Sequence, residues 1–139
     1  MTTKKPRGPI AAAVDFSPAS EAAAGFAAEL ARAREVPLLV IHVLEVLPPI
    51  IPGTETFFSE DLKRAIAKDR RREKAQLSAF VRRLSARRVK VSAVWREGRP
   101  ATEIVKAAEE LGAEVILMGT RRLSELEKEI GRASCRERV

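Results

Sequence analysis

The residues best suited to chemistry follow an apolar run late in the chain, in the segment Met118-Gly119-Thr120-Arg121-Arg122. A glycine at the end of a strand lets the backbone approach a ligand closely, and a helix that begins after it offers unpaired N–H groups and a partial positive charge. The Thr120 hydroxyl and the two guanidinium groups would add donors, so an anion such as a phosphate would be well bound. A tight turn that needs glycine for its geometry alone explains the same residues equally well, and the sequence contains no Walker or G-x-G-x-x-G loop.

Asp15 follows another apolar run, at a point where a helix is expected to begin. A carboxylate there can accept a hydrogen bond from a ribose hydroxyl, or it can cap the helix by accepting from backbone N–H groups. Capping is the more common use, and only a position at the ligand-binding edge of a sheet favours the first role. A phospho-accepting receiver domain would need an aspartate at the end of the third strand, where this chain has Trp95-Arg96-Glu97-Gly98.

Composition excludes several classes of protein. The chain has 139 residues with one cysteine and one histidine, which excludes a disulfide framework and a zinc site with several Cys or His ligands. His42 lies inside an apolar run, where a hydrogen-bonded core residue is the usual interpretation. No residues suggest a general base or a nucleophile, so we do not expect a dedicated enzyme. Since no apolar run suits a signal peptide or a membrane span, we expect a cytoplasmic protein.

Most of the excess behind the net charge of +7 lies in one segment, residues 63–88. The only acids in this segment are Asp69 and Glu73. Its basic residues are at positions 63, 64, 68, 70, 71, 72, 74, 82, 83, 87 and 88. Such a segment could bind nucleic acid or anionic lipid. Because no aromatic residues interleave with its first basic residues, and because long Lys and Arg stems commonly cover a solvated helix face, we favour the solvated face.

Four short apolar runs predict the strands that would position these residues: Ile10–Val14, Leu38–Leu44, Val89–Val94 and Val115–Met118. The first, second and fourth are nearly continuous, which is typical of parallel strands buried on both faces. The third alternates with polar residues, as a half-exposed edge strand does.

Helices are predicted between these strands. Ser17 is expected to cap the first helix, with Pro18 at its first position and an apolar stripe at Ala22, Phe26 and Leu30. A long charged helix is expected over about residues 59–88, after a Pro-rich surface loop at 47–58, and a fourth helix near residue 123. The third helix is expected to begin at Pro100 and end at Gly112, and its inward-facing residues to be Ile104, Ala107, Ala108 and Leu111.

This alternation of strands and helices predicts an α/β fold with a doubly wound parallel sheet and right-handed crossovers. In such sheets, ligands bind beyond the carboxyl ends of the strands, where the strand order reverses. If the first and fourth strands flank this point, the site is framed by residues 15–17 and 118–120.

Four segments resemble the universal stress protein family in order and spacing, and the similarity covers residues 10–128: Ala13-Val14-Asp15-Phe16-Ser17, Ile41-His42-Val43, Gly98-Arg99-Pro100 and Met118-Gly119-Thr120. The resemblance implies a parallel sheet in the order 3-2-1-4-5, of the adenine-nucleotide alpha-hydrolase-like type. It also implies a cytoplasmic protein, in most members a homodimer, and in one subclass a bound ATP with Mg²⁺.

The resemblance assigns roles to individual residues. In the ATP-binding subclass the aspartate of the first strand contacts the ribose and the residue after the strand-two histidine lies against adenine, which are Asp15 and Val43 here. The phosphate motif of the subclass is G-x2-G-x9-G-[ST]; Gly119 and Thr120 match its start, and Arg122 stands in place of the second glycine. The predicted nucleotide site is therefore Ala13, Val14, Asp15, Val43, Gly98, Met118, Gly119, Thr120 and Arg122.

The resemblance also divides the chain into a basic lead (residues 1–9), an incomplete family domain (10–129) and a tail (130–139). The tail lacks the Gly-Ser and the fifth strand of the family, and it resembles the translation of a short-read sequencing adapter. We therefore expect it to be non-native. Without strand five, strand four would be an open edge, and the homodimer contact of a full-length parent would be in doubt.

Together these observations predict a stress-response module that binds ATP or another adenine nucleotide at the carboxyl ends of the first and fourth strands. The alternative is a family member that binds no ATP and acts through protein partners. Binding of nucleic acid or a membrane surface through residues 63–88 is the least favoured alternative.

Overall fold

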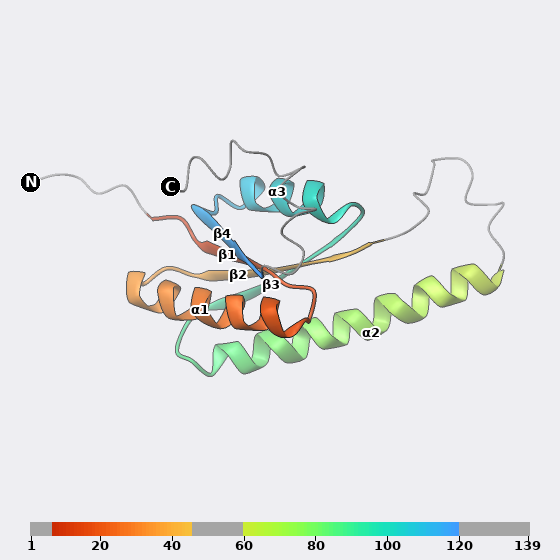
Figure 1. Cartoon of the computed structure of the whole chain (residues 1–139), viewed down its shortest axis with the longest axis horizontal. Coiled ribbons are helices and arrows are strands. Elements are labelled where there is room, and N and C mark those ends of the chain that lie inside the picture. The colour runs from red at the N-terminus through yellow and green to blue at the C-terminus, as the bar shows by residue number, and fades with distance from the viewer. Residues whose placement is uncertain (1–6, 46–59, 120–139) are drawn as a thin grey trace, which may run out of the picture.

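The computed structural model describes residues 7–45 and 60–119. Strands and helices alternate along this part of the chain, as Figure 1 shows. The elements are β1 (Ile10–Ala13), α1 (Pro18–Arg34), β2 (Leu38–Leu44), α2 (Glu60–Ser85), β3 (Val91–Glu97), α3 (Pro100–Glu110) and β4 (Val115–Met118). The expected fourth helix, the loop at 47–58 and the tail at 130–139 lie outside the described residues.

The strands form one parallel sheet in the order β3-β2-β1-β4, which confirms the predicted doubly wound fold and the family order of these strands. β1 is central: Ile10 pairs with Leu38 of β2 on one side and with Val115 of β4 on the other. The chain leaves β1 toward β2 and returns from β3 to β4 across β1. The strand order therefore reverses beside β1.

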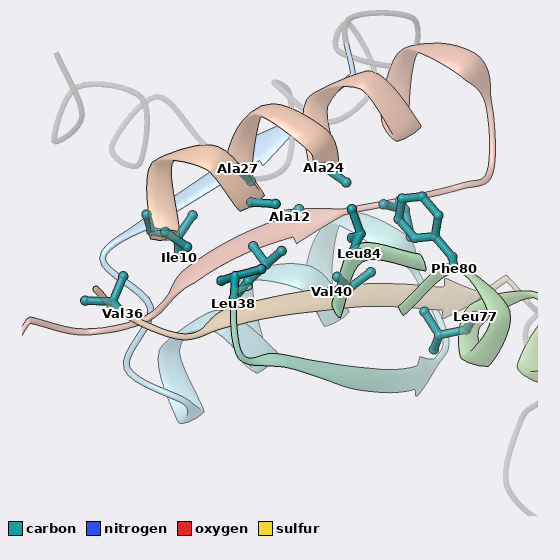
Figure 2. Close-up of a cluster of buried hydrophobic side chains, with 14 residues drawn as sticks. Ile10, Ala12, Ala24, Ala27, Val36, Leu38, Val40, Leu77, Phe80 and Leu84 are labelled. Carbon is teal, nitrogen blue, oxygen red and sulfur yellow. The ribbon is translucent and has the colours of Figure 1, made fainter. Parts of the chain in front are cut away.

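Helices cover both faces of the sheet (Figure 1), with α1 and α2 on one face and α3 on the other. Because successive side chains of a strand point to opposite faces, Ile10 and Ala12 pack toward α1 and α2, whereas Ala11 and Ala13 pack toward α3. Figure 2 shows the larger of these two clusters, in which Phe80 of α2 joins residues of β1, β2 and α1. All of β1 is thereby buried.

The packing face of α1 differs from the predicted stripe. Its buried residues are Ser20, Ala24, Ala27, Ala28 and Ala31, whereas the side chain of Phe26 is 63% exposed. Alanines bring the helix close to the sheet, and Figure 2 shows Ala24 and Ala27 directed toward β1. The prediction from the larger apolar residues was wrong, because α1 packs close to the sheet and only small side chains fit between them. The predicted start is confirmed: Ser17 caps the helix and Pro18 is its first residue.

Four other boundary or burial predictions need correction. The third strand is Val91–Glu97, not Val89–Val94, because Arg88 has a left-handed backbone (φ 62°) and the chain turns there before it enters the sheet. The first strand ends at Ala13, one residue before Val14. Leu111 is 42% exposed because it follows the end of α3, and β4 is only partly buried because it lies at the edge of the described sheet.

Five of the nine basic residues of α2 form ion pairs with nearby acids. Ion pairs join Lys63 to Glu60, Arg64 to Asp61 and Arg72 to Asp69 within the helix. Three more join arginines of residues 63–88 to other elements: Arg70–Glu97, Arg83–Glu21 and Arg87–Glu29. This pairing agrees with a solvated helix face. None of the described helices is long and apolar enough to cross a membrane.

The alanine face of α1 makes a testable prediction. Ala27→Leu places three extra carbons where the side chain has no exposed surface, so we expect a loss of about 1–3 kcal/mol in the free energy of unfolding, measured by urea denaturation. The matched control is Phe26→Ser, which should change stability by no more than about 0.5 kcal/mol because Phe26 is exposed. A larger loss in the control than in Ala27→Leu would contradict the observed orientation of α1.

Candidate functional site

A cleft of about 300 Å³ opens at the carboxyl ends of β1, β2 and β4, where the strand order reverses. Its walls come from these strand ends, from the first turn of α1, from the middle of α2 and from the start of α3. The lining residues are Ala13, Val14, Asp15, Ser17, Ser20, His42, Val43, Leu44, Glu45, Asp69, Glu73, Pro100, Ile104, Met118 and Gly119.

The turn from β1 into α1 is held by a small hydrogen-bond network. Asp15 Oδ1 accepts from the backbone N–H of Ser17 at 3.0 Å, and Ser17 Oγ accepts from the N–H of Ser20 at 3.2 Å. The Ser20 hydroxyl donates to the Ser17 carbonyl at 3.0 Å and accepts from the Asp15 N–H at 3.2 Å. Phe16, between them, has a left-handed backbone (φ 65°), a conformation that a bulky residue adopts only when its surroundings enforce it. The network therefore fixes the Asp15 carboxylate at the cleft.

Gly119 brings the end of β4 against the first turn of α1. A Cβ atom at this position would lie 2.7 Å from the backbone nitrogen of Ser20 and 2.8 Å from the carbonyl carbon of Ala19, so no larger residue fits without a shift of the backbone. The N-terminus of α1 carries a partial positive charge and lines the same cleft. The glycine thus allows the end of β4 to approach this helix end closely.

His42 is buried, and both of its ring nitrogens are hydrogen-bonded. Nδ1 lies 2.8 Å from the carbonyl oxygen of Val14, and Nε2 lies 2.6 Å from Oε1 of Glu73. This confirms a hydrogen-bonded histidine in the core, 5% exposed, although its side chain also lines the cleft. Its ring packs between those of Phe16 and Trp95, with centroids 4.5 Å and 5.6 Å away.

A second polar link joins α2 to the end of β3. Arg70 donates two hydrogen bonds to Glu97, at 2.7 Å and 2.9 Å, and the Trp95 indole donates a third at 3.0 Å. The guanidinium of Arg70 is the main reason that the pKa of the Glu97 carboxyl lies below its usual range. The side chain of Lys74 lies over the Trp95 ring, 5.3 Å from its centroid.

The cleft has a one-sided charge. Four carboxylates line it, those of Asp15, Glu45, Asp69 and Glu73, and no lysine or arginine does so within the described residues. The α2 wall is therefore unfavourable for phosphate, whereas the start of α1, beside Gly119, carries the partial positive charge of a helix N-terminus. Within residues 7–45 and 60–119, no group of three His, Cys, Asp or Glu side chains is arranged to hold a metal ion.

The cleft brings together six of the predicted site residues: Ala13, Val14, Asp15, Val43, Met118 and Gly119. Gly98 is not among the described lining residues; its N–H donates to the Leu44 carbonyl at 3.0 Å, and Pro100 reaches the cleft instead. Thr120 and Arg122 lie outside the described residues.

Sequence reasoning missed the contribution of α2. Asp69 and Glu73 are the only acids in the basic segment 63–88, and their four-residue spacing puts them on one helical face. That pattern could have marked a face with its own role. The prediction missed this face because it considered only the positive charges of the segment.

The fold and the cleft define an α/β protein with a ligand site at the switch point of a parallel sheet. Over residues 6–134 the sequence matches the model of the universal stress protein family, and the chain belongs to that family. A universal stress protein of Thermus aquaticus is 37% identical over 114 residues, which cover 82% of this chain and 77% of the relative.

Solved structures agree with this assignment. A universal stress protein from Burkholderia pseudomallei has 27% identity and a TM-score of 0.65, with 88% of this chain and 89% of that one covered. One from Archaeoglobus fulgidus, in complex with dAMP, has 26% identity and a TM-score of 0.56, covering 79% and 78%. A family protein from Arabidopsis thaliana, with AMP bound, shares the fold at 16% identity and a TM-score of 0.65, covering 91% and 86%.

The contact at Gly119 predicts a steric effect. Gly119→Ala forces the end of β4 away from α1, and we expect a loss of about 1–3 kcal/mol in the free energy of unfolding, measured by urea denaturation. Gly25→Ala is the matched control: its Cβ would meet only the movable tip of Arg87, and alanine is the better helix former, so stability should stay equal or rise by up to about 1 kcal/mol. Equal stability of Gly119→Ala and the parent chain would contradict the close approach.

Proposed function

We propose that the cleft binds an adenine nucleotide, with the ribose at Asp15, the adenine against Val43 and the phosphate at Gly119 and the N-terminus of α1. The observation that carries this proposal is the convergence of these three residues, from three separate segments of the chain, on one cleft. A family member with dAMP and a protein of the same fold with AMP support the choice of ligand.

The chemistry of the cleft suits the parts of such a ligand. A carboxylate accepts hydrogen bonds from ribose hydroxyls, and Asp15 is held for this by the N–H of Ser17. The apolar side chains of Val43, Ile104 and Met118 offer surface for a base. The partial positive charge at the start of α1 suits phosphate, in contrast to the carboxylates of the α2 wall.

ATP is the ligand that the family resemblance implies, and we propose that it binds together with Mg²⁺. Because four carboxylates line the cleft, a bare triphosphate would be repelled, and a bound cation would reduce that repulsion. Among the described groups, the carboxylates of Asp15 and Glu45 would interact with the cation, and the N-terminus of α1 would interact with the phosphates. No described residue is placed as a nucleophile, and both nitrogens of His42 are already engaged, which favours a binding protein over an enzyme.

A second function rests on the chain's resemblance alone: a cytoplasmic family member that binds no nucleotide and acts through protein partners, as a homodimer in its full-length form. The nucleotide proposal has the stronger physical basis, because it explains why Asp15, Val43 and Gly119 meet.

The test is calorimetric titration of the chain with AMP and with ATP, the latter with and without Mg²⁺. We expect saturable binding, weakened at least tenfold by Asp15→Ala, since a hydrogen bond to a charged group contributes about 1.5–3 kcal/mol. Asp61→Ala, a change of the same kind on the exposed start of α2, should leave binding unchanged. Absence of saturable binding in the folded parent chain would overturn the proposal and favour the protein-partner function.

A further inference from the structure

We propose that His42 and Glu73 form a proton-dependent latch that positions α2 as a wall of the nucleotide cleft, so that nucleotide affinity falls when the pair loses its shared proton as the pH rises. The proposal rests on the proposed function for its effect on affinity. The latch itself is a property of the chain without ligand, and it can be tested separately.

The hydrogen count at His42 is the first step of the argument. The carbonyl oxygen of Val14 can only accept, so Nδ1 must carry the hydrogen of the 2.8 Å contact. The 2.6 Å contact between Nε2 and Oε1 of Glu73 then needs a second hydrogen, on one atom or the other. Without it, either the lone pair of Nε2 faces the carboxylate of Glu73 or, in the other tautomer, the lone pair of Nδ1 faces the carbonyl oxygen of Val14, and the facing atoms repel. The two contacts of His42 therefore coexist only while the pair holds one shared proton.

The latch matters because no described side chain of α2 between residues 60 and 76 is fully buried. The buried residues of the helix are Leu77, Phe80 and Leu84, all in its C-terminal half, and Figure 1 shows the N-terminal half projecting past the sheet. In the middle of the helix, its contacts with other elements include the hydrogen bonds Glu73–His42 and Arg70–Glu97 and the contact of Lys74 with the Trp95 ring. Loss of the first contact would leave α2 folded and anchored but would release the segment that faces the cleft.

The same contact reaches the nucleotide site through the backbone. Val14, whose carbonyl accepts from His42, directly precedes Asp15, and the Phe16 ring lies 4.5 Å from the imidazole. His42 and Glu73 also line the cleft themselves. A change in their contact therefore alters the α2 wall and the support of the ribose-binding carboxylate together, so both are positioning residues.

Several charged groups face the pair. Asp15 and Glu45 come from the ends of β1 and β2, and Asp69 lies one turn earlier on α2. Lys74 and the Arg70–Glu97 pair lie on the Trp95 side of the imidazole. Glu73 is the only side chain in the described part of the chain that hydrogen-bonds His42. The surrounding carboxylates contribute to the electrostatic potential at His42, but the latch consists of the single contact between His42 and Glu73.

Glu73→Gln separates the proton from the contact. The glutamine amide can donate to unprotonated Nε2 while Nδ1 still donates to Val14, so the latch stays closed at every pH. AMP affinity of the parent chain should fall as pH rises, by at most tenfold per pH unit for one proton. Affinity of Glu73→Gln should lack this fall, and Glu73→Ala should bind weakly throughout.

The matched control is Asp69→Asn, which removes a cleft carboxylate from the same helix face without touching His42 and should keep the fall with rising pH. The phosphate of AMP titrates equally for all variants, so it cancels in the comparison. Identical pH profiles for the parent chain and Glu73→Gln would overturn the latch, as would loss of the fall in Asp69→Asn.

A measurement without nucleotide distinguishes this proposal from the proposed function. His42 is the only histidine in the chain, so its ring ¹⁵N resonances are unambiguous. We expect the Nε2 resonance to move with pH in the parent chain and to stay constant in Glu73→Gln over the pH range in which it moves in the parent chain. If it moves in this way but no variant binds AMP, the latch stands and the proposed function fails. If the Nε2 resonance is the same in both proteins at every pH, the latch is wrong.

Discussion

The fold depends on one constraint, the complete burial of β1 between two strands and two layers of helices. β1 pairs with β2 and β4 along its whole length, and its residues Ile10–Ala13 are covered on both faces. Alanines at the centre of the sheet let α1 approach closely from one side and α3 from the other. Because β1 is central, the chain that leaves it must emerge where the strand order reverses, and this is where Asp15 and the start of α1 meet the end of β4.

At this edge, apolar packing gives way to hydrogen bonds. The turn after β1 is held by Asp15, Ser17 and Ser20, and α2 is held by its contacts with His42 and Glu97. Buried polar groups need partners, and each of these has one; among the described residues, no buried side-chain nitrogen or oxygen lacks a hydrogen bond. The cleft is therefore fixed by a polar network built on an apolar sheet.

Sequence patterns predicted the parallel sheet and the residues at the strand ends, because these depend on burial and on a general rule about where parallel sheets bind ligands. The strand order was implied by the family resemblance. The patterns failed for the buried face of α1, where alanines rather than Phe26 meet the sheet. They also missed Asp69 and Glu73, since nothing local shows that a helix distant in sequence from β2 packs beside His42. Contacts between segments that are far apart in the sequence depend on how the whole chain packs, and hydrophobic periodicity does not predict this.

The central claim is that the reversal beside β1 forms the ligand site of this universal stress protein. Its most direct test is to map the backbone amides that respond to AMP in ¹H–¹⁵N correlation spectra. The account predicts that the largest shifts fall on residues 14–17, Val43 and Gly119, which line or border the cleft. Shifts confined to the outer face of α2, or to β3, with none at these residues, would contradict it.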